Sequence, residues 1–174
     1  KVMSKELEIA KITKKKNTLS KGWEKMTKDL RNYLEKGDMD MYYMNKVMPH
    51  IFHWPEKSIQ NIEQFKILRQ YKNSKFYNTI INNTDYGPKG INLDLGVQMD
   101  RVQQTWSIFI LVERLKLNLN EEEIIFEFGG GTGQMADVLK DLDFKGTHIV
   151  YDLPLMTLLQ KYFVEKRNIK TNYI

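Results

Sequence analysis

The chain has 174 residues, of which 41% are hydrophobic and 11% aromatic, enough to bury the core of one domain with a helical extension. It contains no cysteine, which excludes disulfides and thiolate metal sites. No apolar run approaches the roughly 18 residues of a membrane span, and no signal-peptide pattern opens the chain. We therefore expect a cytoplasmic protein that does not span a membrane.

The formal net charge is +5, and its most visible cluster is Lys14-Lys15-Lys16. Such a run either attracts an anionic partner or forms a solvated helix end. No aromatic residues alternate with these lysines, as they do in sites for single-stranded nucleic acid. We favour the helix end and expect no nucleic-acid partner.

Residues 1–120 are expected to be mostly helical, because apolar side chains recur three or four positions apart behind capping serines. The predicted helices begin after Ser4, after Ser20, at Met39, after Ser58 and at Leu93. Gly37 ends the second helix and Pro49 the third. A segment rich in turn-forming residues, 82–90, precedes the long helix Leu93–Leu117.

The pattern changes in residues 121–174. Short apolar runs at 124–128 and 148–151 predict buried strands, and 172–174 can start a third. Helices are expected at 132–142 and 155–166 between them. Strands that alternate with helices form a parallel sheet. The predicted fold class is α/β: a helical N-terminal region, 1–120, followed by the first half of a Rossmann-like sheet, 121–174.

A glycine-rich turn follows the first predicted strand. Gly129, Gly131 and Gly133 lack a Cβ, so the chain can turn sharply there and a ligand can lie against its backbone. Asp152 ends the second strand, at the same edge of a parallel sheet, where a carboxylate can accept hydrogen bonds from ribose hydroxyls. The pattern predicts a site for a nucleoside-containing cofactor.

Two cofactors fit these glycines. The spacing Gly131-x-Gly133-x-x-Ala136 satisfies the dinucleotide fingerprint of NAD(P)-dependent oxidoreductases. With Glu127 in front, the same loop satisfies the [D/E]-x-G-x-G-x-G pattern of methyltransferases that use S-adenosylmethionine (SAM). A carboxylate repels a pyrophosphate but favours a sulfonium and an ammonium group. Glu127 therefore favours SAM, with the oxidoreductase as the alternative.

The segment Ile125 to Gly133 resembles motif I of class I SAM-dependent methyltransferases. Asp152-Leu153-Pro154, followed by a helix rich in Leu, Gln and Tyr, resembles the bacterial sugar O-methyltransferase family. The resemblance covers roughly residues 120–168 and implies a truncated class I fold. It implies that Glu127, Gly129, Gly131 and Gly133 line SAM, that Asp152 holds the ribose, and that Leu153 packs near the adenine. It also implies a sugar-like acceptor and no metal.

The class I fold normally has seven strands, so we expect the chain to be an inactive fragment whose missing strands follow residue 174. A homodimer through the helical region is a further expectation. The third functional alternative is non-catalytic: a helical binding or dimerisation module beside a degenerate α/β half.

Weaker candidates lie in the helical region. His50 and His53 have a spacing suited to a metal or a general base, but ordinary loop histidines are the favoured interpretation. Arg101, Gln103 and Gln104 can reach the SAM carboxylate, although solvent-facing positions are favoured. An adaptable apolar surface is formed by Met39, Met41, Met44 and Met48, although helix packing explains it more readily. The loop Tyr86-Gly87-Pro88 can cover the cofactor.

Overall fold

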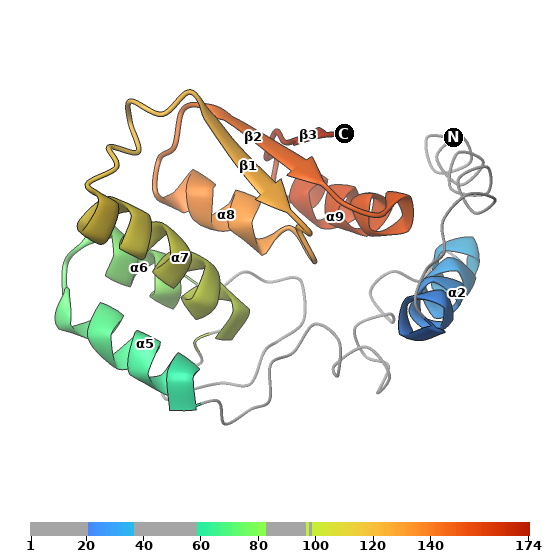
Figure 1. Cartoon of the computed structure of the whole chain (residues 1–174), viewed down its shortest axis with the longest axis horizontal. Coiled ribbons are helices and arrows are strands. Elements are labelled where there is room, and N and C mark those ends of the chain that lie inside the picture. The colour runs from blue at the N-terminus through green and yellow to red at the C-terminus, as the bar shows by residue number, and fades with distance from the viewer. Residues whose placement is uncertain (1–20, 37–58, 83–96, 98) are drawn as a thin grey trace.

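The computed structural model describes residues 21–36, 59–82, 97 and 99–174 (Figure 1). The described part contains helices and a small parallel sheet. In chain order the elements are α2 (Lys21–Lys36), α5 (Ile59–Gln70), α6 (Lys75–Ile81), α7 (Met99–Leu115), β1 (Ile124–Phe128), α8 (Gln134–Asp141), β2 (Thr147–Tyr151), α9 (Pro154–Lys166) and β3 (Asn172–Tyr173).

Helices α5 and α6 are separated by a short turn that the sequence did not predict. Asn73 in this turn has a φ of +72°, a left-handed conformation that asparagine tolerates better than most residues. The Ser74 side chain then accepts a hydrogen bond from the Tyr77 N–H at 3.1 Å and caps α6. The turn folds α6 back beside α5, so that both helices pack against α7.

The three helices bury one apolar cluster. Its residues come from all three helices and from the position just before α7: Phe65, Leu68, Ile80, Val97, Val102 and Phe109. Helix α7 begins at Met99, later than the predicted start at Leu93, and residues 93–96 lie outside the described residues.

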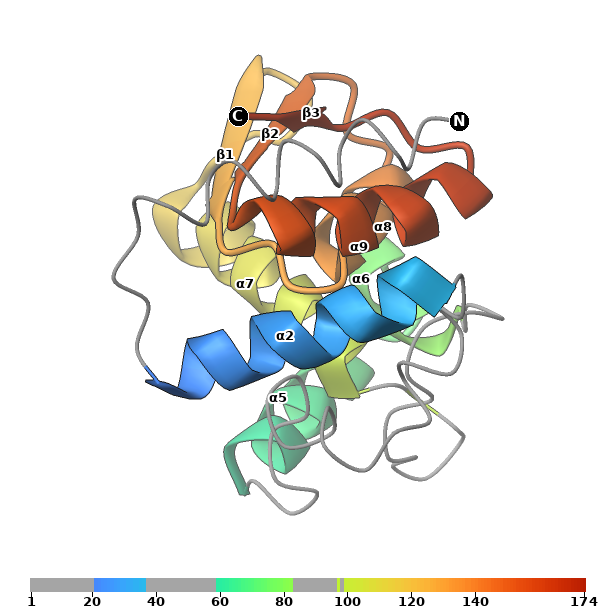
Figure 2. The same ribbon diagram turned by 90° about the vertical axis from the view of Figure 1, so that its right-hand side faces the viewer.

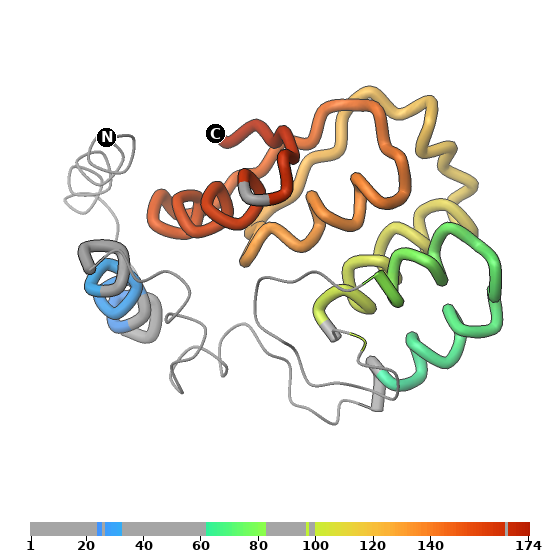
Figure 3. The backbone as a smooth tube through the Cα atoms, turned by 180° about the vertical axis from the view of Figure 1, so that it is seen from behind, coloured from blue at the N-terminus to red at the C-terminus, as the bar shows by residue number. Residues whose placement is uncertain are grey.

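The sheet has the strand order β1-β2-β3, and both pairings are parallel. The predicted alternation of strand and helix over residues 124–173 is confirmed. Glu127 lies opposite Val150, which lies opposite Tyr173 on β3. Because the strands are added in one direction, right-handed crossovers carry both connecting helices to one face of the sheet. Figures 1 and 3 show α8 and α9 side by side on that face.

A second apolar cluster joins the two predicted regions. Ile108 of α7 packs against Val138 and Leu139 of α8 and against Leu142, which follows that helix, and Ile125 of β1 contacts the same cluster. One core therefore spans residue 120, where the sequence places a domain boundary. The glycine loop ends at the start of α8, the helix that packs on α7.

The other face of the sheet is apolar and exposed. Alternate β1 residues point away from α8 and α9: Ile124 is 57% exposed, Phe126 55% and Phe128 77%. The Phe128 ring stacks on Tyr151 of β2, with centroids 5.5 Å apart. An apolar face on this scale marks an association surface or a liability to aggregation.

Helix α2 packs against α9 on the side away from the sheet (Figure 2). Leu30 is fully buried in this helix, whereas Glu24, Lys25 and Lys28 are exposed. This apolar and polar division confirms the predicted helix behind Ser20 and gives α9 a cover on its outer side.

Candidate functional site: the glycine loop and Asp152

The loop of residues 129–133 joins β1 to α8 at the carboxyl end of the parallel strands. Gly129, Gly131 and Gly133 have φ values of +76°, +54° and +83°, in the region that favours glycine. The Gly133 N–H donates to the Gly130 carbonyl at 2.8 Å and closes the turn. The Gly129 N–H donates to the Tyr151 carbonyl at 2.9 Å, which ties the loop to the end of β2.

The glycines differ in what surrounds them. A Cβ at Gly129 would meet nothing within 4 Å, so the backbone there is open to a ligand. A Cβ at Gly133 would lie 2.7 Å from Cγ2 of Val164, so this glycine lets α9 approach closely. Gly130 was not among the predicted site residues, yet its Cβ would lie 2.7 Å from Cγ1 of Val150 and 2.8 Å from Oε1 of Gln160. Gly130 and Gly133 thus serve packing.

The Asp152 carboxylate is held against this loop. Its Oδ1 accepts the Leu153 N–H at 2.7 Å, its Oδ2 accepts the Gln160 side-chain amide at 2.6 Å, and the Gly131 N–H donates to the same carboxylate. Burial raises the pKa of Asp152, and these three hydrogen bonds oppose the rise. The structure therefore brings together two of the predicted elements, the glycine loop and the aspartate.

Leu153 and Pro154 shape the chain after Asp152. Leu153 precedes α9 with extended backbone angles, φ −59° and ψ 139°, and Pro154 starts the helix at the first turn, where its missing N–H costs no hydrogen bond. The Leu153 side chain is half-buried beside the loop. The Asp-Leu-Pro sequence thus leads from β2 into α9, and the Asp152 carboxylate accepts the N–H of the residue that precedes the helix.

The Glu127 side chain lies on the face of the sheet that α8 and α9 cover, opposite to the exposed Phe126 and Phe128. Its side chain is 12% exposed, and its Oε2 lies 3.1 Å from Nε2 of His148, which is 4% exposed. Sequence reasoning missed His148. When this imidazole carries a proton, it compensates the Glu127 charge, and the repulsion of a pyrophosphate falls. Glu127 still acts on the site at longer range, since its charge contributes to the raised pKa of Asp152.

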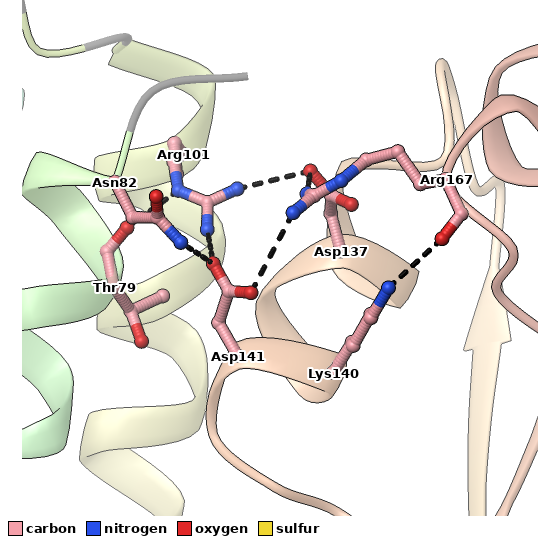
Figure 4. Close-up of polar contacts among 7 residues, drawn as sticks. All are labelled: Thr79, Asn82, Arg101, Asp137, Lys140, Asp141 and Arg167. Carbon is pink, nitrogen blue, oxygen red and sulfur yellow. Dashed lines mark hydrogen bonds and ion pairs between the residues drawn. The ribbon is translucent and has the colours of Figure 1, made fainter.

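Arg101 is neither solvent-facing nor at the glycine loop. It is fully buried, its Nε donates to the Thr79 carbonyl, and its guanidinium contacts Asp137 at 3.0 Å and also Asp141 (Figure 4). Arg167, just after α9, contacts the same two carboxylates from the other side. The favoured solvent-facing interpretation of Arg101 is wrong, because α7 packs on α8 and turns this position inward. Arg101 belongs to a buried ion-pair network.

The remaining candidates lie elsewhere. Gln103 and Gln104 are half-buried on α7. His50 and His53, together with the methionine surface and the Tyr86 loop, are outside the described residues. Within the described ranges, no three His, Cys, Asp or Glu side chains are grouped as a metal site would require. In the same ranges, no helix combines the length and the apolar character needed to cross a bilayer.

Comparisons with known proteins identify no relative. Neither a family model, nor a curated protein, nor a solved structure matches this chain.

Proposed function

We propose that this chain carries the SAM-binding part of a methyltransferase that acts on a hydroxyl of a sugar or a sugar-like small molecule. The observation that carries the proposal is the contact between the Asp152 carboxylate and the Gly131 N–H. This contact joins the end of β2 to the glycine turn after β1, and nucleosides bind at that edge of α/β sheets.

The chemistry of the loop suits SAM better than a phosphate-containing cofactor. Residues 129–133 contain no Lys or Arg, so the loop offers no side-chain cation to a pyrophosphate. Asp152, which accepts from the loop, and Glu127, whose charge acts on Asp152, favour a ligand that carries a sulfonium and an ammonium group. The open space above Gly129 gives such a ligand access to the backbone.

SAM would supply the reaction with an electrophilic methyl group. The residues of this chain would hold the nucleoside: Asp152 would accept a ribose hydroxyl, and the loop would fix the direction in which the sulfonium points. Methyl transfer is an in-line displacement, in which accurate positioning is worth about 7–11 kcal/mol when the geometry is ideal. On this proposal the main contribution of the described site is orientation.

A nicotinamide-dependent oxidoreductase is the second candidate. It is favoured by one observation, the position of Glu127 on the covered face of the sheet and next to His148. There the carboxylate is partly shielded, so it opposes a pyrophosphate less than its place in the sequence implies. The fingerprint Gly131-x-Gly133-x-x-Ala136 is satisfied as well, and Ala136 is buried.

Calorimetry with S-adenosylhomocysteine and with NADH separates the two candidates. We expect binding of S-adenosylhomocysteine and no binding of NADH. Asp152→Asn should weaken that binding by roughly 10-fold or more, because a charged acceptor is lost. Asp143→Asn, at an exposed aspartate that pairs with Lys145 between α8 and β2, is the control and should bind like the wild type. Binding of NADH alone would replace the proposal with the oxidoreductase.

Glu127→Ala distinguishes the candidates a second time. It should weaken the binding of SAM, and by a smaller factor that of S-adenosylhomocysteine, if the charge assists the sulfonium and ammonium groups. It should leave or improve NADH binding if the site takes a dinucleotide. The acceptor class is tested separately, with labelled SAM and a panel of sugars and phenols. Transfer to phenols alone would refute the sugar assignment but retain the methyltransferase.

A further inference from the structure

Helix α9 has a polar side chain in its buried face. Gln160 is 0% exposed and lies among Met156, Leu159 and Phe163, all of which are buried. A buried amide without hydrogen bonds is unfavourable by about 1–3 kcal/mol, so its partners explain why it is there. Its Nε2 donates to Asp152 Oδ2 at 2.6 Å. Among the described residues, its Oε1 accepts no hydrogen bond, and this atom lies next to Gly130.

The hydrogen bond to Gln160 limits what Asp152 can offer to a ligand. A carboxylate accepts about four hydrogen bonds. Leu153, Gln160 and Gly131 already supply three donors, and Leu153 and Gly131 donate from the backbone, which the loop and the start of α9 fix. Gln160 is the one donor of the three that a substitution can remove. Its amide therefore decides how the carboxylate is turned and which lone pair remains for a hydroxyl.

We propose that Gln160 is a positioning residue, which holds the Asp152 carboxylate against the glycine loop and sets the oxygen that it presents to a ribose hydroxyl. The inference rests on the proposed function, since it assumes that Asp152 binds a nucleoside. Its first part, the coupling of Gln160 to Asp152, can be measured without any ligand. The coupling of Gln160 to Asp152 and the proposed function can therefore fail separately.

The first experiment follows the side-chain ¹³C signal of Asp152 during a pH titration of the ligand-free 174-residue chain. Gln160→Leu removes the donor and retains the bulk, so the pKa of Asp152 should rise above its wild-type value. Gln160→Glu should raise it further, because two carboxylates at this separation compete for one proton. The charge of Glu127 acts on Asp152 equally in all variants. Gln70→Leu, an exposed position on α5, is the matched control and should leave the titration unchanged.

The second experiment measures S-adenosylhomocysteine affinity against pH. Gln160→Leu should weaken binding by roughly 10-fold to 100-fold, as expected when a hydrogen bond to a charged group is lost. For Gln160→Glu, the loss should be smallest near pH 5 and should grow toward pH 8, where the new carboxylate is ionised. A residue that only fills space would weaken binding by the same factor at every pH.

The outcomes are distinct. An unchanged Asp152 titration in both Gln160 variants overturns the inference, and so does a changed titration with wild-type affinity. If the wild type binds no S-adenosylhomocysteine, the proposed function and the positioning role both fail, but the coupling is still judged by the titration. If both variants unfold, the Gln160 side-chain amide signals of the wild type decide. The chemical shifts of these amide signals should change with pH with the same midpoint as the Asp152 titration. Amide signals that do not change at that midpoint would contradict the inference.

Discussion

The guanidinium of Arg101 on α7 lies 3.0 Å from the Asp137 carboxylate on α8, and neither side chain is more than 5% exposed. Asp137 sits in the first turn of α8, directly after the glycine loop. The pair therefore ties the helical region to the helix on which the candidate site is built. Arg167 and Asp141 extend the network, so that the segment after α9 joins the same attachment (Figure 4).

Arg101→Met should destabilise the protein by about 3–5 kcal/mol, because it removes one of the two arginines that compensate the buried carboxylates of Asp137 and Asp141. Urea unfolding measures the change. Arg114→Met is the matched control, since Arg114 is an exposed arginine on the same helix, and it should stay within about 0.5 kcal/mol of the wild type. Equal losses in the two variants would show that the buried pair contributes nothing specific.

The same variant should also become sensitive to pH. Burial raises the pKa of Asp137 to about 7, and the charge of Arg101 opposes that rise. Without Arg101 the pKa rises further, so the folded state holds the proton more tightly than the unfolded chain does. Stability is then lost as the pH rises through the folded pKa. Relative to the wild type, Arg101→Met should therefore lose more of its free energy of unfolding at pH 8 than at pH 5. A loss of stability that does not depend on pH would contradict this role of Asp137.

Asp100, in the first turn of α7, provides a separate test of burial. Burial raises its pKa from 3.8 to about 6. The folded state therefore favours the protonated form, and stability falls as the pH rises from about 4 to about 6. Asp100→Asn removes the charge and should stabilise the protein above pH 6 by about 1–3 kcal/mol, with little effect near pH 4. Urea unfolding over this pH range measures both limits, and a constant difference would refute the explanation.

Gly133 and Gly129 form a matched pair with similar backbone angles and different surroundings. Gly129→Ala should cost about 1–2 kcal/mol, the strain of a left-handed alanine. Gly133→Ala should cost about 2–5 kcal/mol, since its Cβ also overlaps Val164. Val164→Ala should recover part of the loss in Gly133→Ala but not in Gly129→Ala. Thermal unfolding of the two glycine variants, each with and without Val164→Ala, measures the recovery. An equal recovery in both glycine variants would exclude the close contact between Gly133 and α9.

The exposed face of the sheet should make the chain self-associate. Phe126 is 55% exposed on this face, so Phe126→Lys should reduce association at little cost in stability, within about 1 kcal/mol. Light scattering against concentration measures the effect. Leu115 is 68% exposed at the end of α7, away from the sheet, and Leu115→Lys is the control. An equal reduction in both variants would point to added charge in general and not to this face.

The sequence by itself determined the order of strands and helices in residues 124–173 and the place of the glycine turn. These features depend on short-range effects: apolar runs, the conformational freedom of glycine, and the fixed φ of Pro154. It also determined that Asp152 lies at the edge of the sheet where Gly131 turns, because parallel strands end at one edge. The turn at Asn73 was missed, since neither an asparagine nor a serine alone interrupts an apolar helical pattern.

Tertiary packing decided which side chains meet. Arg101 and Asp137 are 36 positions apart, and nothing local to α7 indicates that its arginine faces α8. His148 lies beside Glu127 only because β2 pairs with β1 in one register and α8 and α9 cover that face. The sequence analysis did not single out Gln160, whose one signal is that it is an amide at a core position of an apolar helix. Its partner followed only from the docking of α9 on the glycine loop, because the direction of a buried polar side chain is set by what surrounds it.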